Sequence, residues 1–378
     1  MLKFKTFDSD RTGEETYLDA SLEDFLPPDV AEKTQIATDM DGTMFNNDLG
    51  RLVFMVKLLD PKFWRIDPAE FKELLLPYEH VRVIKQGKQG FIDHPEMSIS
   101  NCTEILGLHR DLCLLYKLMH TRINGTDLFL EDSIINEFAA KMIAFDKLII
   151  LLEMYLRAVF NNQLLMRVRF FGGHDASIMP VLTKDALSIS QQHPERFITL
   201  QSHDDTREFV PQEIELPPIE FDRYAEANEQ VRRVIARLVV ENRAKICVVT
   251  TNLQSIANAA IAYSRFAPYF REDSSFGSRL VKNGNVYETC LDGDPVFGPE
   301  KVKLAERAAF SNGCDFKVAI GDNANNDGPM MKKALENNGL VFIVGEEFET
   351  IRNHFAEWFK QVESLPKVEQ RILVVETL

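Results

Sequence analysis

The sequence feature that most constrains this chain is a short strand-like run that ends in two closely spaced aspartates. Residues 35–38 have the character of a short strand, and Asp39, Asp41 and Gly42 follow it directly. Strand side chains alternate in direction, so Asp39 and Asp41 can face one crevice while Met40 points away. Two carboxylates this close repel each other unless a cation lies between them. An ordinary strand followed by an Asx-Gly turn is the alternative, and this stretch alone leaves both interpretations open.

Apolar runs and amphipathic segments alternate in the second half of the chain. Residues 246–249 form a continuously apolar run, as expected of a strand buried on both faces, and 316–320 and 340–344 are also expected to be buried strands. Segments with helical spacing stand between them. This alternation predicts a doubly wound α/β domain with a parallel sheet, built from residues 30–50 and 221–378. The last apolar run, at 372–375, is expected to add an edge strand.

The character of the chain changes between residues 51 and 220. Two stretches there, 101–121 and 131–170, repeat apolar residues at intervals of three and four, which is the spacing of amphipathic helices. We therefore expect a mainly helical domain inserted after the first strand of the core. Residues 1–29 are polar and acidic and end in prolines, so we expect them to form an arm on the surface.

Two polar segments stand where predicted strands meet predicted helices. Thr250, Thr251 and Asn252 end one strand just before a helix, where a hydroxyl and free backbone N–H groups make an anion site. An ordinary threonine N-cap is the common alternative. Lys301 begins a helix, against the helix dipole, which is favourable only if a phosphate and carboxylates lie in front of it. A surface lysine is the simpler interpretation of that position taken alone, and Lys303 is the alternative candidate.

A loop rich in oxygen donors follows the apolar run at 316–320. It spans 321–328 and contains Asp322 and Asp327, whose carboxylates suit a hard cation. An EF-hand would need an oxygen ligand where Ala324 stands, so that interpretation is poor. Each segment is a weak signal by itself. Because ligands of open α/β sheets bind at the carboxyl ends of the strands, the four segments together predict one site.

In their order, the four segments resemble the motifs of the haloacid dehalogenase (HAD)-like hydrolase superfamily. Asp39 to Thr43 resembles the first motif, Thr251 the second, Lys301 the third, and 321–328 the fourth, GDxxxxD. The long insert lies where the C1 caps of this superfamily are inserted, and 279–302 resembles the phosphoserine-phosphatase-like branch. Two departures count against phosphoserine itself. A Thr-Asn pair replaces the Ser-Gly-Gly of true phosphoserine phosphatases, and the cap is longer than a minimal four-helix bundle.

The resemblance implies a chemical role for each residue. Asp39 would attack phosphorus and form an aspartyl-phosphate, and Asp41 would act as the general acid and then as the general base. Thr251 and Lys301 would neutralise the phosphoryl oxygens, and Lys301 would also keep Asp39 ionised. The residues expected to bind the substrate are Gly42, Thr43 and Asn252. The residues expected to hold Mg²⁺ are Asp39, Asp41 through its backbone carbonyl, Asp322 and Asp327.

The resemblance thus predicts a magnesium-dependent phosphatase that hydrolyses a phosphomonoester. A small phosphorylated metabolite is favoured as the substrate, because a long cap covers the site when it closes. Three alternatives stay open: a phosphoprotein phosphatase that uses the insert as a docking platform, a phosphomutase, and a non-catalytic protein that binds a partner through the insert. Asp41 favours phosphatase or mutase chemistry, because the ATPases of this superfamily have threonine there.

Composition limits the partners and the compartment. The 378 residues carry a formal net charge of −15, with a pI near 5.1, which argues against a general binder of nucleic acid or membrane surfaces. Five cysteines without a CxxC pair favour a reducing compartment. We find no signal-peptide pattern and no apolar run long enough to span a bilayer, so we expect a cytoplasmic protein.

Overall fold

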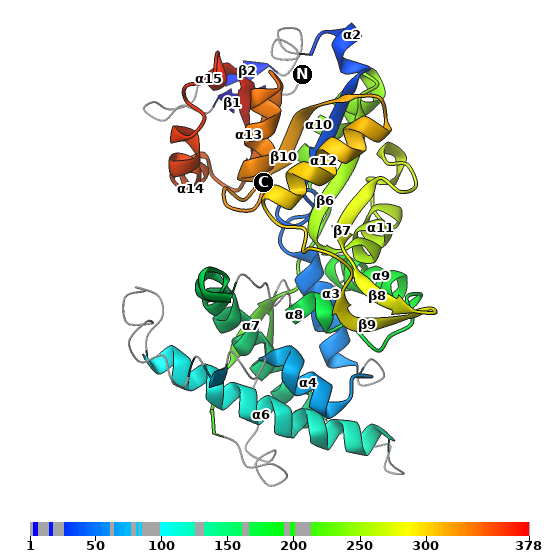
Figure 1. The fold of residues 1–378 in the computed structure, drawn as a ribbon, viewed down its shortest axis with the longest axis vertical. Coiled ribbons are helices and arrows are strands. Elements are labelled where there is room, and N and C mark those ends of the chain that lie inside the picture. The colour runs from blue at the N-terminus through cyan, green and yellow to red at the C-terminus, as the bar shows by residue number, and fades with distance from the viewer. Residues whose placement is uncertain are drawn as a thin grey trace.

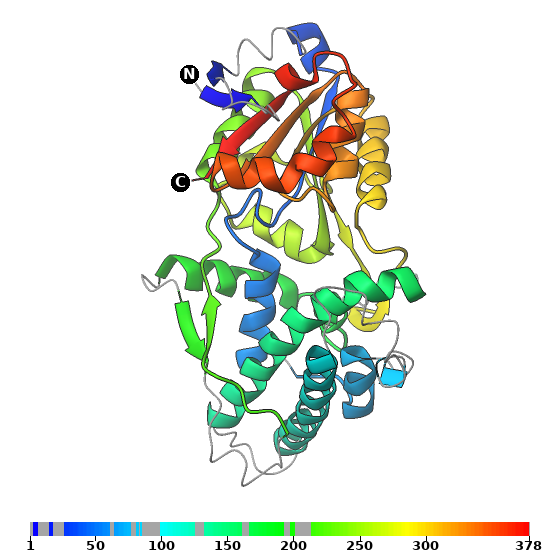
Figure 2. The same ribbon diagram turned by 90° about the vertical axis from the view of Figure 1, so that its left-hand side faces the viewer.

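A computed structural model of the chain divides into an α/β core and a mainly helical insert (Figures 1 and 2). The structure describes residues 3–6, 15–17, 26–60, 64–76, 81–82, 84, 99–124, 132–160, 166–192, 197–200 and 213–377. Among the described helices, none combines the length and the apolar character that crossing a membrane requires.

An eight-stranded sheet forms the centre of the core. Its strands, in spatial order, are β2 (Glu15–Tyr17), β1 (Lys3–Thr6), β12 (Ile372–Glu376), β11 (Leu340–Gly345), β10 (Asp315–Gly321), β3 (Thr34–Thr38), β6 (Lys245–Leu253) and β7 (Ser275–Ser278). The six strands from β12 to β7 run parallel to one another. The predicted doubly wound α/β core is therefore confirmed.

The edge of the sheet next to β12 differs from the expectation. β1 pairs antiparallel with β12 through Lys5 and Val374, and β2 pairs antiparallel with β1. The run at 372–375 is thus not an edge strand. The described parts of residues 1–29 contribute two strands to the sheet, where the sequence predicts a surface arm. Strands this short carry little periodicity, and their pairing partner lies more than 350 residues away in the chain.

Helices cover both faces of the sheet because the strand side chains alternate. Ile36 and Ile320 belong to one apolar cluster, whereas their neighbours Ala37 and Ala319 belong to another. The first cluster includes α10 (Glu229–Ala236), the π-helical turn η3 (Arg237–Glu241) and α11 (Gln254–Ala262). The second includes α12 (Pro299–Ser311), α13 (Gly328–Glu336) and α14 (Phe348–Lys360). Three short helices complete the core: α2 (Pro28–Ala31), η4 (Ala267–Tyr269) and α15 (Val368–Arg371).

The insert follows β3 in the chain. Its helices are α3 (Leu49–Leu59), α4 (Pro68–Leu75), α6 (Ile99–Asn124), α7 (Asp132–Phe160), α8 (Met166–Arg169) and α9 (Ile178–Gln192). A two-stranded antiparallel ribbon, β4 (Phe197–Leu200) with β5 (Ile219–Asp222), ends it. Helix α3 leads out of the core and packs against α7 and α9, and α9 packs against α11 of the core (Figure 1).

A hairpin from the second half of the chain lies against the insert. It consists of β8 (Leu280–Asn283) and β9 (Val286–Leu291). Backbone N–H groups of Gly173 and Ala176 donate to the carbonyls of Tyr287 and Asn285 at 2.7 and 2.8 Å. The turn residues Asn283, Gly284 and Asn285 predict a hairpin at 280–287, but the sequence pattern assigns residues 221–378 to the core alone. In the structure the hairpin gives the insert a second attachment, beyond the covalent connections near β3 and β5.

Candidate active site

Asp39 stands at the carboxyl end of a strand that is buried along its whole length. Its backbone N–H donates to the carbonyl of Ile320 on β10 at 2.9 Å, which extends the sheet by one residue and fixes the direction of the side chain. Only 6% of Asp39 is exposed. Its carboxylate therefore faces the junction of the central strands, where open α/β sheets bind their ligands.

Lys301 connects Asp39 to the loop after β10. The Lys301 Nζ lies 2.8 Å from Asp39 Oδ1 and 2.7 Å from Asp327 Oδ1, and Lys301 is fully buried. Burial opposes the ammonium charge, but Asp327 and Asp39 outweigh it and raise the pKa of Lys301 above its ordinary value. Burial and the charge of Asp327 raise the pKa of Asp39 to about 7, against the opposing effect of Lys301.

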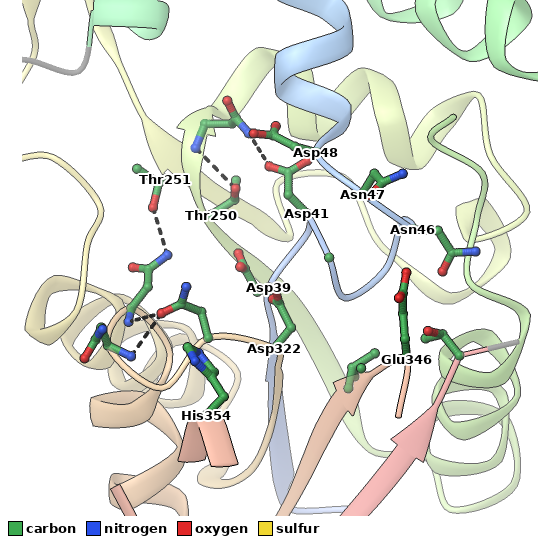
Figure 3. Close-up of a pocket in the computed structure, with 18 of the residues that line it drawn as sticks. Asp39, Asp41, Asn46, Asn47, Asp48, Thr250, Thr251, Asp322, Glu346 and His354 are labelled. Carbon is green, nitrogen blue, oxygen red and sulfur yellow. Dashed lines mark hydrogen bonds between the residues drawn. The ribbon is translucent and has the colours of Figure 1, made fainter. Parts of the chain in front are cut away.

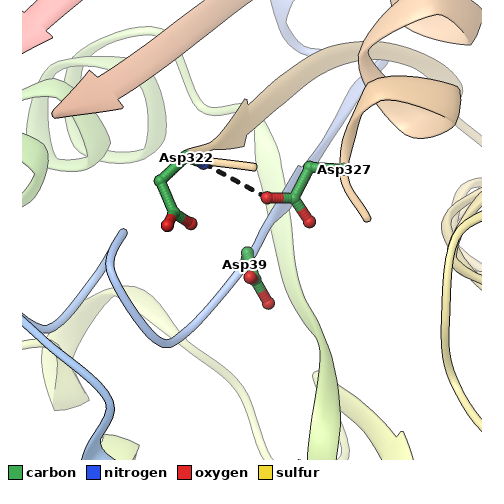
Figure 4. A group of neighbouring side chains, drawn as sticks. All are labelled: Asp39, Asp322 and Asp327. Atoms are coloured by element: carbon green, nitrogen blue, oxygen red, sulfur yellow. Dashed lines mark hydrogen bonds between the residues drawn. The ribbon is translucent and has the colours of Figure 1, made fainter. Parts of the chain in front are cut away.

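Three carboxylates converge around this lysine (Figure 4). One oxygen from each of Asp39, Asp322 and Asp327 lies within 4.8 Å of the others. Asp327 also accepts hydrogen bonds from the backbone N–H groups of Asp322 and Asn323 at 3.2 and 3.1 Å. Burial, followed by the charges of Asp327 and Asp39, raises the pKa of Asp322 well above its ordinary value.

The donor set of this cluster fits a divalent cation. Two buried carboxylates and the half-buried Asp322 face one ammonium, so the ionised cluster keeps an excess of two negative charges at the end of the sheet. Buried charge of this kind is costly unless it is paired or coordinates a metal. All the donors are oxygens, which Mg²⁺ prefers over nitrogen or sulfur. The predicted ligands Asp39, Asp322 and Asp327 are therefore close enough to share one ion.

Asp41 occupies a different part of the site from Asp39, Asp322 and Asp327, which we call the acidic trio. Its carboxylate accepts from the backbone N–H of Gly50 at 3.2 Å and from the side-chain amide of Asn252. Burial, followed by the charges of Asp48 and Asp39, raises the pKa of Asp41 well above its ordinary value. A carboxyl group that holds its proton in this way is suited to donate it to a leaving group.

Gly42 and Thr43 shape the turn between the two aspartates and the insert. Gly42 has a φ of +70°, and a Cβ at this position would lie 2.2 Å from Asp322 Oδ2. Only glycine allows both this backbone conformation and this close approach. The buried hydroxyl of Thr43 donates to Asp322 Oδ1 at 2.9 Å, so Thr43 helps to orient the Asp322 carboxylate.

The polar segment at the end of β6 brings both threonines to the cavity (Figure 3). The Thr251 hydroxyl accepts from the side-chain amide of Asn326 at 3.2 Å. The Thr250 hydroxyl is buried and accepts from the backbone N–H of Asn252 at 3.2 Å. Lys303, the alternative to Lys301, is exposed and pairs with Glu300 at 2.7 Å. It lies outside the site.

A cavity of about 1190 Å³ opens above these residues. Asp39, Asp41, Gly42, Thr251, Asn252 and Asp322 line it, whereas Thr43, Lys301 and Asp327 lie buried behind that lining. The insert contributes Ile149, Met166, Arg167 and Val168 to its wall. The insert thus forms one side of the space in which a substrate would lie.

The sequence analysis missed an ion-pair network in this wall. Arg167 Nη1 lies 2.5 Å from Asp48 Oδ2, and Arg167 Nε lies 3.3 Å from Asp146 Oδ1. Burial opposes the charge of Asp48, but Arg167 outweighs it and lowers the pKa of Asp48 below its ordinary value. Only Asp48 could have been noticed in the sequence, as the N-cap of α3, where its side chain accepts from the backbone N–H of Arg51 at 2.7 Å. No spacing relates it to the other two residues.

The core side of the cavity includes a second group that the sequence analysis missed. Glu346 and Glu347 follow β11, and His354 lies on α14. His354 Nε2 accepts from the backbone N–H of Ala324 at 3.4 Å, which ties α14 to the loop of the acidic trio. The two glutamates belong to no motif, and His354 reaches the site only through the packing of α14 on the sheet.

Comparisons with known proteins show the fold of this chain. No family model matches it, and no curated protein does. A conserved protein of unknown function from Anaerococcus prevotii DSM 20548 has 15% identity and a TM-score of 0.60, over 91% of this chain and 89% of that chain. This likeness shows a shared fold along almost the whole chain.

Structures of hydrolases are also similar to this chain, at lower TM-scores. A HAD family hydrolase from Salmonella enterica serovar Typhi has 12% identity and a TM-score of 0.36, over 82% of this chain and 62% of that chain. A phosphoserine phosphatase complex with bound substrate has 15% identity and a TM-score of 0.34, over 82% of this chain and 86% of that chain. HAD-family hydrolases are thus among the proteins to which this chain is similar.

Proposed function

We propose that this protein is a magnesium-dependent phosphohydrolase of the HAD type, which hydrolyses a phosphomonoester through an aspartyl-phosphate on Asp39. One observation carries the proposal. The ammonium of Lys301 lies between Asp39 and Asp327, while Asp322 lies within 4.8 Å of both carboxylates. A nucleophilic carboxylate, a cation that holds it ionised and two further carboxylates for a metal are what phosphoryl transfer to an aspartate requires.

The acidic trio is the proposed metal site, with the backbone carbonyl of Asp41 as a further ligand. When bound there, Mg²⁺ would offset the charge of the phosphoryl oxygens beside the ionised Asp39. Lys301 supplies a second positive charge at the same place. Thr251 is the proposed hydroxyl donor to a phosphoryl oxygen, and Asn252 orients Asp41 through its amide.

Asp41 carries the proton in the proposed reaction. The Asp39 carboxylate forms a bond to phosphorus as the bond between phosphorus and the ester oxygen breaks, and Asp41 protonates that oxygen as it leaves. Asp41, now ionised, takes a proton from the water that attacks the aspartyl-phosphate, which releases phosphate and restores Asp39. The raised pKa of Asp41 supports the first of these two roles.

The cavity supports a small phosphorylated metabolite as the substrate. Its volume of about 1190 Å³ exceeds the usual upper range of a drug-sized ligand pocket only slightly. The insert forms one wall and the core forms the other, so the organic part of a small ester can be enclosed. A folded phosphoprotein would need the insert to stand away from the site.

An aryl phosphate assay tests the proposed function. We expect turnover with Mg²⁺, no turnover with excess EDTA, and recovery when Mg²⁺ is restored. Asp39→Asn should lower kcat by about 10⁴-fold or more, because the amide does not attack phosphorus. The exposed Asp315→Asn is the matched control and should retain activity. Activity that survives complete metal removal, or a fully active Asp39→Asn, contradicts the proposal.

A further inference from the structure

The cavity extends well beyond the acidic trio, and its other walls are also acidic. Among the described residues that line it, seven carry carboxylates and one, Arg167, carries a guanidinium. The seven are Asp39, Asp41, Asp48, Asp146, Asp322, Glu346 and Glu347. This excess of negative charge is unusual in a cavity proposed to bind a phosphate ester, because most of these carboxylates would repel the phosphoryl group.

Five of the seven have a partner or a role within the site. Asp39, Asp41 and Asp322 belong to the proposed reaction and metal site. Asp48 and Asp146 are both held by Arg167, at 2.5 and 3.3 Å. The arginine is therefore committed to two carboxylates, and that network still has an excess of one negative charge. It does not supply a free cation for a second anionic group of the substrate.

Glu346 and Glu347 are the two that are left. Both are exposed at the end of β11, and neither lies within ion-pair distance of a lysine, arginine or histidine in the part of the chain that the structure describes. In Figure 3 the Glu346 side chain points toward Asn46, on the loop that leads from Asp41 into the insert. Glu346 lines the same cavity as Asp39, so its carboxylate is open to a substrate that extends from Asp39 along this wall.

The charge on these walls selects among substrates by electrostatics. Fields from like charges in a cleft are focused by its low-dielectric walls, so they act over most of the bound molecule. Lys301 and the metal offset the phosphoryl group itself. A second anionic group would meet an excess of carboxylates, whereas a cationic group would be attracted to them.

We propose that the alcohol released by this enzyme carries a positive charge, as in the phosphate ester of an amino or ammonium alcohol. Glu346 is then a specificity-determining residue that contacts the cationic group. This inference rests on the proposed phosphohydrolase function. It adds the substrate class, which the motifs of the reaction site leave undefined.

A matched series of two-carbon esters tests the inference with the full-length protein. The series is 2-aminoethyl phosphate, ethyl phosphate and phosphoglycolate, which differ in the charge at the far carbon, with an aryl phosphate as the reference substrate. We expect kcat/KM to fall from the cationic to the neutral to the anionic ester. In Glu346→Gln, the ratio of the cationic to the neutral ester should fall about 10-fold through KM, because one attractive charge is lost. The ratio of the anionic to the neutral ester should rise.

The exposed Glu363→Gln, outside the cavity, is the matched control and should leave all ratios unchanged. Thermal unfolding of both variants confirms that each is folded. If the aryl phosphate is hydrolysed but the three esters show no charge order, or Glu346→Gln leaves the ratios unchanged, the inference is overturned and the proposed function stands. If no phosphate ester is hydrolysed, the proposed function itself fails. These results separate the two claims.

Discussion

Two buried lysines, one in the core and one in the insert, have nearly the same ionic surroundings. Lys301 in the core lies 2.8 and 2.7 Å from Asp39 and Asp327. Lys141 in the insert lies 2.5 and 3.3 Å from Asp111 and Glu137. Both lysines are fully buried. Their different roles must therefore come from what surrounds each cluster.

The cluster in the insert is completed by hydrogen bonds to backbone groups of the insert itself. Asp111 accepts from the backbone N–H groups of Glu213 and Ile214 at 2.8 and 2.9 Å, and Lys141 donates to the carbonyl of Ile214 at 2.6 Å. These bonds tie the end of the insert to α6 and α7. In the core, by contrast, Asp39 and Asp322 face the cavity. The ion pair in the insert is structural because the protein satisfies its carboxylate oxygens. The ion pair in the core can take part in a reaction because carboxylates of its cluster face the cavity.

The largest effect should come from removing the lysine of the insert. Lys141→Met leaves Asp111 and Glu137 buried without their cation, so the free energy of unfolding should fall by about 3–5 kcal/mol. The kcat of the molecules that stay folded should change little. Urea unfolding measures the first effect, and an active-site titration normalises the second. Lys147→Met, an exposed position on the same helix, is the control.

The matching substitution in the core should act mainly on the reaction. Lys301→Met removes the charge that faces both Asp39 and the phosphoryl oxygens, so kcat should fall about 10²- to 10³-fold at saturating Mg²⁺. Lys303→Met, two residues along the same helix and exposed, should keep its activity. A Lys301→Met protein that is unstable yet fully active when folded would show that the two clusters have the same role.

The positions of the reaction residues could be predicted because each follows a local rule. Asp39 and Asp322 come directly after strands of the parallel sheet, and Lys301 begins a helix. Parallel strands then bring their carboxyl ends together without further information. Glu346 also follows a parallel strand, β11, but no motif distinguishes it, and Arg167 and His354 follow no such rule. Their places depend on how α8 and α14 pack, which involves contacts between residues far apart in the chain.

The fold was predictable to a similar extent. Alternation of strands and helices defined the parallel sheet, and three-and-four spacing defined the insert. The pairing of β1 with β12 joins positions 5 and 374, and the hairpin of β8 and β9 bonds to residues 173–176. Backbone hydrogen bonds of this kind do not depend on side-chain pattern, so the sequence alone did not indicate them.

The pH dependence of stability should distinguish the cluster of Lys301 in the core, which faces the cavity, from the cluster of Lys141 in the insert. The pKa of Asp39 is raised to about 7 from its ordinary value of 3.8, so the folded state holds a proton that the unfolded state releases. Without metal, stability should therefore fall as the pH rises from about 4 to about 7. Mg²⁺ should raise the melting temperature more at pH 8 than at pH 5. Asp39→Asn should flatten this dependence, and an unchanged slope in that variant would contradict the assignment.

The smallest expected effect concerns the two threonines at the end of β6. Thr251→Val should lower kcat/KM about 10-fold, the usual consequence of losing one hydroxyl contact that strengthens in the transition state. Thr250→Val should cost less, because its hydroxyl already accepts from Asn252. A larger loss in Thr250→Val would assign the phosphoryl contact to that residue instead.

Chemical trapping at Asp39 tests the central claim most directly. In Asp41→Asn the base that activates water is absent, so an aryl phosphate should leave phosphate on the enzyme. Borohydride reduction of an aspartyl-phosphate yields homoserine, which peptide mass spectrometry locates. The account predicts homoserine at position 39 after incubation with substrate and Mg²⁺, and none after incubation without substrate. Reduction at another residue, or none at position 39 while the wild type turns over, would contradict it.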